Sequence, residues 1–209
     1  RTPSRVVWRE GASLLREYGG GGEGPPVVFV YAMVNRPVIL DLLPGLSVIE
    51  GLVAAGRRVF LLDWGAPRSE DAGRDLSEYV EGVLSRAVDA ARRRSKAEAV
   101  HLAGYCEGGV FSLLYTALRP DTVRTLTLVA TPVDGARLGT LSVWAKRKNL
   151  DSERLADAFG NIPGSLLFAA FELLKPLTSL RAESGFLGAL WSGRTGERDE
   201  ERFLALERW

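Results

Sequence analysis

One short stretch constrains the fold of this chain more than any other. Residues 98–118 begin with an apolar run that predicts a buried strand, and they end with apolar residues at helical spacing. Gly104, Cys106 and Gly108 lie between these two parts. This is the spacing of a nucleophile elbow, a sharp strand-to-helix turn, with cysteine in the place of the usual serine. The glycines are expected where the strand and the helix approach too closely for a Cβ atom.

The chemistry expected of Cys106 follows from this turn. The start of the helix would direct N–H groups toward the sulfur, and this positive end favours the nucleophilic thiolate. The Glu107 N–H would be placed to bind a negatively charged oxygen of a substrate. The alternative interpretation is a glycine-rich turn with a buried, unreactive cysteine. We favour the nucleophile because a strand precedes the motif, a helix follows it, and Cys106 is the only cysteine in the chain.

A second loop follows another predicted strand. Residues 27–32 form a continuous apolar run that is typical of a buried parallel strand, and Met33, Val34 and Asn35 follow it. Ligands bind at the carboxyl ends of strands in open α/β sheets, and in a hydrolase-like fold this loop supplies the second N–H for an oxyanion. Met33 is our first choice for this N–H. Val34 is the alternative, because the sequence leaves a shift of one residue open.

Two other polar residues lie in or directly after predicted strands. Asp63 follows the predicted strand over residues 58–62, and bracing the next loop is the role that we favour for it over catalysis. His101 is the only histidine, and it lies inside the strand that leads to Cys106. A strand rises about 3.3 Å per residue, so the imidazole lies too far below the thiol to act as its base. We therefore expect His101 to be a core or sheet-face residue.

The order of the predicted elements indicates an α/β fold. A hairpin is expected over residues 5–18, and a helix from about Ser47 to a stop at Gly56. An amphipathic helix is expected over residues 75–95, and a further strand over residues 123–130. Strands alternating with helices predict a mostly parallel sheet. Residues 1–134 are expected to form this core, whereas the helical patterns of residues 135–209 resemble a cap or lid placed after a strand.

The composition excludes some classes of function. The formal net charge is +1, so no strong electrostatic field favours nucleic acid or an anionic membrane. A single cysteine excludes an internal disulfide and fits a reducing compartment. The sequence also holds no apolar run long enough to span a bilayer.

Several motifs, taken together, resemble those of poly(3-hydroxyalkanoate) synthases, especially the two-subunit kinds called class III and class IV. They occur in the order found in that family, and the resemblance covers nearly the whole chain. Such a set is far more specific than the elbow alone. The matching stretches are residues 30–37, 62–65, 104–109, 131–134, 160–164 and 175–176.

The resemblance implies an α/β-hydrolase core with a helical cap and an acyltransferase activity. Cys106 matches the family's nucleophile, which carries the acyl chain as a thioester while 3-hydroxyacyl-CoA units are joined to a growing polyester. The family implies a small second synthase subunit and a cytoplasmic location at polyester granules, and a homo-oligomer is also considered. Neither a metal nor a separate cofactor is expected, since coenzyme A is part of the substrate. The residues expected to bind substrate are Val34, Asn35, Asp63, Trp64 and Tyr105.

One departure from the family affects the expected activity. In this fold the acid and the histidine of the triad follow the nucleophile, and no histidine follows Cys106. We expect the sequence to stop before the catalytic Asp and His, leaving a sheet edge uncovered and the activity of these 209 residues low. Two alternatives stay open. One is a cysteine hydrolase of the dienelactone type, and the other is a truncated, non-catalytic protein that binds granules or a full-length synthase.

Overall fold

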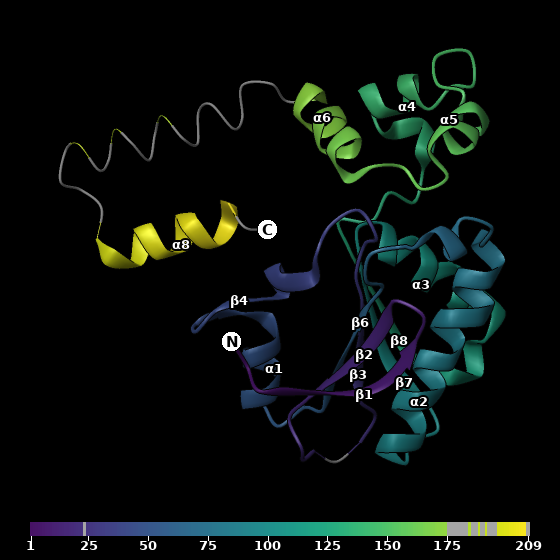
Figure 1. Cartoon of the computed structure of the whole chain (residues 1–209). Helices are drawn as coiled ribbons and strands as arrows, with labels where there is room; N and C mark the ends of the chain where they lie inside the picture. The colour runs from purple at the N-terminus through teal and green to yellow at the C-terminus, as the bar shows by residue number, and fades with distance from the viewer. Residues whose placement is uncertain (23, 175–183, 185–187, 189–190, 192–195, 208–209) are drawn as a thin grey trace. The chain divides into compact units, whose positions relative to one another are not determined.

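The computed structural model describes residues 1–22, 24–174, 184, 188, 191 and 196–207. The chain forms two compact units, Arg1–Val133 and Asp134–Trp209. The first unit is a sheet with helices, and the described elements of the second unit are helices (Figure 1). The expected boundary after residue 134 lies next to this division, and the role of the second unit as a cap stays a prediction.

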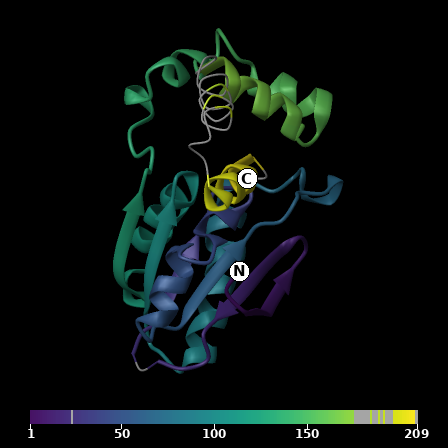
Figure 2. The same cartoon turned by 90° about the vertical axis from the view of Figure 1, so that its left-hand side faces the viewer.

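A sheet of six strands, counted over the described residues, forms the first unit, in the order β1-β2-β6-β3-β7-β8. β3, β6, β7 and β8 run parallel, whereas the β1–β2 hairpin joins β6 in antiparallel fashion. Figure 2 shows this hairpin at one edge of the sheet and β8 at the other. The mostly parallel sheet confirms the predicted α/β fold. The strands are β1 (Ser4–Glu10), β2 (Ser13–Tyr18), β3 (Val27–Val30), β6 (Val59–Asp63), β7 (Val100–Tyr105) and β8 (Val123–Val129).

Helices cover both faces of the sheet, which explains the continuous apolar runs of its central strands. α1 (Val48–Ala54) lies on one face, and α2 (Ser85–Ser95) and α3 (Glu107–Leu118) lie on the other (Figure 1). Alternate residues of β3 therefore enter two different cores. Val28 packs in the cluster that contains Ala87, whereas Phe29 packs with Ile49 of α1. Ser47 caps α1 by accepting a hydrogen bond from the Glu50 N–H at 2.8 Å.

Two local features differ from the expectations. The helix expected over residues 75–95 is not regular, because η3 (Glu78–Leu84) is a π-helix that precedes α2. The apolar side chains of η3 still face the core, so their spacing gave no sign of the wider turn. The loop before α1 contains a small hairpin of β4 (Asp41–Leu43) and β5 (Leu46–Ser47), preceded by the 3-10 helix η1 (Pro37–Leu40). These strands are too short for an alternating pattern to predict them.

The second unit contains α4 (Thr140–Trp144), α5 (Ser152–Phe159), α6 (Gly164–Leu174) and α8 (Glu197–Glu207). The motif residues Lys175 and Pro176 lie outside the described residues. Over the residues that the structure describes, no helix has the length and hydrophobicity needed to cross a membrane.

A buried carboxylate ties β2 to its neighbours. Glu17 is 3% exposed, and its Oε2 accepts hydrogen bonds from Arg5 Nε at 2.7 Å and from Arg94 Nε at 2.8 Å. Burial opposes the ionisation of Glu17, but the hydrogen bonds and charges of Arg5 and Arg94 outweigh it and lower its pKa below the ordinary value. A lowered pKa in the folded state stabilises the fold above the unfolded pKa, and this contribution is lost as the pH falls through the folded pKa.

We therefore predict that Glu17→Gln lowers the free energy of unfolding by about 2 kcal/mol at pH 7. The difference from the wild type should shrink below a pH of about 4, where Glu17 becomes protonated in the unfolded chain and then in the folded chain. Urea unfolding at several pH values measures both effects. Glu70→Gln is the control, because the Glu70 side chain is 67% exposed and its pairing with Arg68 should contribute little. An equal loss in the two variants would contradict the prediction.

Candidate functional site

The connection order of the sheet places two loops side by side. β3 has β6 on one side and β7 on the other, so the chain leaves β3 in one direction and later returns past it. The carboxyl ends of β3 and β7 therefore form a topological switch point, where open α/β sheets bind ligands. Met33 follows β3 and Cys106 follows β7. The site expected from the sequence thus lies where this topology favours one.

The backbone at Cys106 has the geometry of a sharp turn. Cys106 lies between β7 and α3 with φ 53° and ψ −125°. A positive φ is costly for a residue with a side chain, and such strained residues cluster at functional sites. The Cys106 N–H donates to the Val129 carbonyl at 2.8 Å, which fixes the turn against the end of β8. Cys106 is a free cysteine of intermediate exposure, and it packs against the core cluster that contains Tyr31 and Ile49. Whether it is the nucleophile or the unreactive cysteine of the alternative interpretation stays a prediction.

The glycines of the motif are required by close packing around this turn. A Cβ atom on Gly104 would lie 2.7 Å from Ser112 Oγ of α3. A Cβ atom on Gly108 would lie 2.5 Å from the Tyr31 carbonyl oxygen, just beyond β3. At Gly109, the Cβ atom would meet the side chain of Thr131, which belongs to another of the matching motifs. The three glycines therefore lie where the elbow packs closely against α3, the residue after β3 and the segment that contains Thr131.

The loop after β3 is bound to the elbow by a contact that the sequence did not reveal. The Met33 N–H donates a hydrogen bond to Oε2 of Glu107 at 3.0 Å. On the other side of Ala32, the Tyr31 carbonyl accepts a hydrogen bond from Trp64 Nε1 at 2.8 Å. Glu107 is the first residue of α3, where a backbone N–H has no partner inside the helix. The Glu107 side chain therefore contacts the loop, whereas the Glu107 backbone N–H lies at the start of α3.

The predicted substrate-binding residues of this loop differ in their surroundings. Val34 is 38% exposed, which places it at the surface of the loop. Asn35 Oδ1 is buried and has no hydrogen-bond partner among the described residues. A buried acceptor without a donor is costly, so Asn35 is suited to accept a hydrogen bond from a bound molecule. Substrate binding by both residues stays a prediction.

The other predicted substrate-binding residues support the loops. Trp64 is buried, and its ring makes edge-to-face contacts with Tyr79 at 5.8 Å and with Phe111 at 5.5 Å between centroids. Asp63 Oδ1 accepts the Gly65 N–H at 3.0 Å, a contact that fits the bracing role favoured for Asp63. Tyr105 is partly buried, and its ring stacks on Tyr31 with centroids 5.0 Å apart. A contact of Asp63, Trp64 or Tyr105 with substrate stays a prediction.

His101 lies where the sequence placed it, on the sheet rather than at the thiol. Its Nδ1 is 2.8 Å from Thr125 Oγ1, on the neighbouring strand β8. His101 and Thr125 are partners in the register of β7 and β8. The only histidine of the sequence therefore contacts a residue within the sheet. His101 is not placed to act as the base for Cys106.

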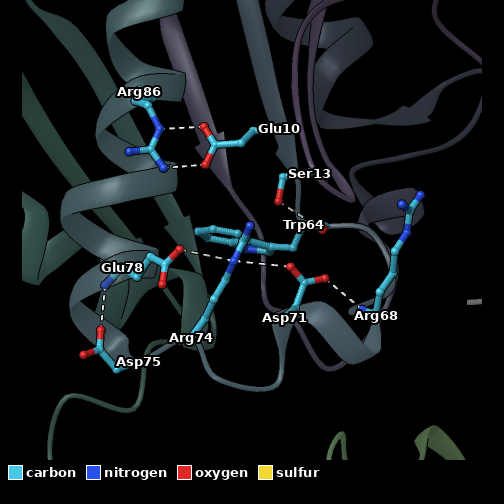
Figure 3. A network of polar contacts seen from close by, with 9 residues as sticks. All are labelled: Glu10, Ser13, Trp64, Arg68, Asp71, Arg74, Asp75, Glu78 and Arg86. Carbon is cyan, nitrogen blue, oxygen red and sulfur yellow. Dashed lines mark hydrogen bonds and ion pairs between the residues drawn. The ribbon is translucent and has the colours of Figure 1, made fainter.

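A small surface hollow lies beside the loop, with Met33, Trp64 and Arg74 among its lining residues. Figure 3 shows the polar network at this place. Asp71 is buried, accepts the Arg68 N–H at 2.8 Å and pairs with Arg74 Nε at 3.2 Å. Burial, followed by the nearby negative charge of Asp71, raises the pKa of Tyr79 above its ordinary value. The sequence indicated only a polar, irregular segment here, since spacing alone did not reveal the burial of Asp71.

The pattern of the family described as alpha/beta hydrolase fold matches residues 25–195. The chain belongs to this family. The match confirms the hydrolase fold that the elbow and the other motifs led us to expect. Among solved structures, the thioesterase domain from the curacin biosynthetic pathway is 14% identical in sequence. That match covers 79% of this chain and 62% of the thioesterase domain, with a TM-score of 0.49.

This alpha/beta hydrolase is similar to curated proteins named poly(3-hydroxyalkanoate) polymerase subunit PhaC. The protein from Allochromatium vinosum is 41% identical over 85% of this chain and 51% of its own length. The protein from Synechocystis is 39% identical over 84% of this chain and 49% of its own. The protein from Thiocystis violacea is 35% identical over 100% of this chain and 59% of its own. The chain thus spans about half the length of the relatives that it matches.

Proposed function

We propose that this alpha/beta hydrolase is the nucleophile-bearing part of a poly(3-hydroxyalkanoate) polymerase. The single observation that carries the proposal is the strained backbone of Cys106 at the switch point of the sheet, between β7 and α3. The similarity to subunits named poly(3-hydroxyalkanoate) polymerase supports a polyester product. The resemblance of the motifs to that family implies 3-hydroxyacyl-CoA as the substrate. A free cysteine of intermediate exposure at the start of a helix is suited to form a thioester.

In the first step, the Cys106 thiolate attacks the thioester carbonyl of 3-hydroxyacyl-CoA. A new C–S bond forms to Cys106, the C–S bond to coenzyme A breaks, and coenzyme A leaves as a thiolate that takes up a proton. The Glu107 N–H, which has no partner within α3, holds the oxyanion. Because the Met33 N–H already donates to the Glu107 carboxylate, we assign the second donor to Val34, the alternative that the sequence left open.

In the second step, the 3-hydroxyl group of another acyl unit attacks the Cys106 thioester. An ester bond forms, the thioester bond breaks and the hydroxyl proton passes to a base. We propose that this base is a histidine outside these 209 residues, since His101 contacts Thr125 within the sheet. Asn35 Oδ1, a buried acceptor without a partner in the described chain, is suited to bind a donor group of the substrate. We also propose binding roles for Asp63, Trp64 and Tyr105, which lie at or directly after the carboxyl ends of β6 and β7.

The similarity to subunits named PhaC also supports proposals about the surroundings of the protein. We propose that it acts in the cytoplasm at the surface of polyester granules. We further propose that it works with a small second synthase subunit and that copies of it associate. Co-purification of the tagged gene product from granule preparations tests these proposals.

The proposed reaction predicts two products that can be measured. The full translation product of the gene, incubated with 3-hydroxybutyryl-CoA, should release coenzyme A and acquire one 3-hydroxybutyryl group on the peptide that contains Cys106. Mass spectrometry of the digested protein checks the acyl-enzyme, and chromatography separates polymer from free acid. Polymer supports the proposal. Free 3-hydroxybutyrate alone would instead support a cysteine hydrolase, and binding of a full-length synthase without any acylation would support a non-catalytic protein.

A further inference from the structure

We propose that the side chain of Glu107 is a positioning residue, which holds the loop after β3 in place for acyl transfer. This inference rests on the proposed function, and it assigns to the Glu107 carboxylate a role separate from that of the Glu107 N–H. The observation that carries it is the hydrogen bond from the Met33 N–H to Glu107 Oε2 at 3.0 Å. It joins two segments that lie far apart in the sequence, at the positions where the nucleophile and the second oxyanion donor are expected.

The start of this loop is also held at Tyr31. Tyr31 is held through its carbonyl by Trp64 Nε1, and Gly108 packs directly against that carbonyl. Beyond Met33 the chain turns outward, since Val34 is 38% exposed. The next buried residue along the chain is Pro37. The Glu107 contact therefore joins the elbow to the loop directly before the exposed residue Val34.

The chemistry of the contact suits this role. A hydrogen bond to an ionised carboxylate is shorter and stronger than one between neutral groups. Occupying the Met33 N–H fixes the orientation of that peptide, and the direction of the next N–H, at Val34, depends on it. Displacing a reacting group or a donor by about 1 Å can slow a reaction by about 10²-fold. The reach of the Glu107 side chain therefore matters for the rate, in addition to its charge.

A different role would follow from charge alone. Glu107 lies in the first turn of α3, and a negative charge there stabilises a helix. Two variants separate the roles. Glu107→Asp keeps the charge at the helix start, but its side chain is one methylene shorter and should not reach the Met33 N–H. Glu107→Gln loses the charge but keeps an acceptor oxygen at the same distance along the side chain.

The experiment measures the rate of acyl-enzyme formation in the full translation product of the gene, with 3-hydroxybutyryl-CoA and, separately, with p-nitrophenyl acetate. We expect Glu107→Ala and Glu107→Asp to lower the maximal rate constant of acyl-enzyme formation by about 10²-fold, with a smaller change in the substrate concentration that gives half of that rate. Glu107→Gln should stay within about tenfold of the wild type. The control is Glu81→Ala, an exposed glutamate of η3 that should react like the wild type. Alkylation of Cys106 by iodoacetamide needs no oxyanion donor, so its rate should not fall in any variant.

Other outcomes would overturn the inference. If Glu107→Asp reacts like the wild type while Glu107→Gln does not, the charge matters and the contact does not. If Glu107→Ala is faster than the wild type, the carboxylate obstructs the site. If acylation and alkylation fall together, the elbow itself has moved. If the wild type reacts with p-nitrophenyl acetate but not with 3-hydroxybutyryl-CoA, the proposed substrate fails, and the Glu107 variants are still judged with the ester.

Discussion

Replacing Cys106 with alanine is expected to abolish the release of coenzyme A from 3-hydroxybutyryl-CoA. The thiol is the only cysteine side chain of the sequence, and it lies at the strained turn between β7 and α3. Loss of a nucleophile that acts with an oxyanion site costs on the order of 10⁴-fold or more in rate. A thiol-free assay that separates coenzyme A by chromatography measures this loss. Turnover in Cys106→Ala at a rate near that of the wild type would contradict the role of Cys106.

The same position allows a test of the backbone geometry that does not depend on activity. Alanine at a φ of 53° and a ψ of −125° keeps the strain, whereas glycine adopts positive φ readily. Strain of this kind costs about 1–3 kcal/mol, and the greater freedom of glycine in the unfolded chain offsets about 0.5–1 kcal/mol of the gain. We expect Cys106→Gly to have a free energy of unfolding about 1 kcal/mol above that of Cys106→Ala. A less stable glycine variant would show that the turn is not strained.

The strands and the elbow could be predicted because their causes are local. Apolar runs bounded by glycine and proline indicated β3 and β7, and the spacing of Gly104, Cys106 and Gly108 indicated the turn between β7 and α3. A strand and a helix that meet at such a turn leave no room for side chains at the two glycines. The sequence therefore contains the geometry of the turn at Cys106 almost completely.

The contacts that complete the site could not be predicted, because they join distant segments. Glu107 reaches Met33 only because β3 and β7 are neighbours in the sheet. Trp64 reaches the Tyr31 carbonyl from the end of β6, on the other side of β3. A glutamate at the start of a helix and a buried tryptophan each have several possible partners. The order of the strands in the sheet decides which of these partners Glu107 and Trp64 contact.

Gly108→Ala is expected to have a large effect on both the fold and the site. The added Cβ atom would lie 2.5 Å from the Tyr31 carbonyl oxygen and 2.7 Å from the Tyr31 carbonyl carbon. These are backbone atoms of a buried segment, so they cannot rotate away as a flexible side chain can. Strain of this kind in a packed interior costs about 1–3 kcal/mol and at times more. We therefore expect the free energy of unfolding to fall by about 3 kcal/mol.

The activity of Gly108→Ala should fall by more than the loss of folded protein explains. Relief of the contact requires α3 to move away from the end of β3, which separates the Glu107 N–H from the loop that holds Met33. A displacement of about 1 Å is enough to slow acyl transfer by about 10²-fold, even at a temperature where the variant is fully folded. Urea unfolding and the rate of acyl-enzyme formation measure the two effects.

The control is Gly51→Ala in α1, where a Cβ atom meets nothing within 4 Å. That substitution should raise the free energy of unfolding by about 0.5–1 kcal/mol, because alanine favours a helix interior, and leave acylation unchanged. Equal stability and equal rates in the two glycine variants would mean that the elbow does not pack against β3 as described.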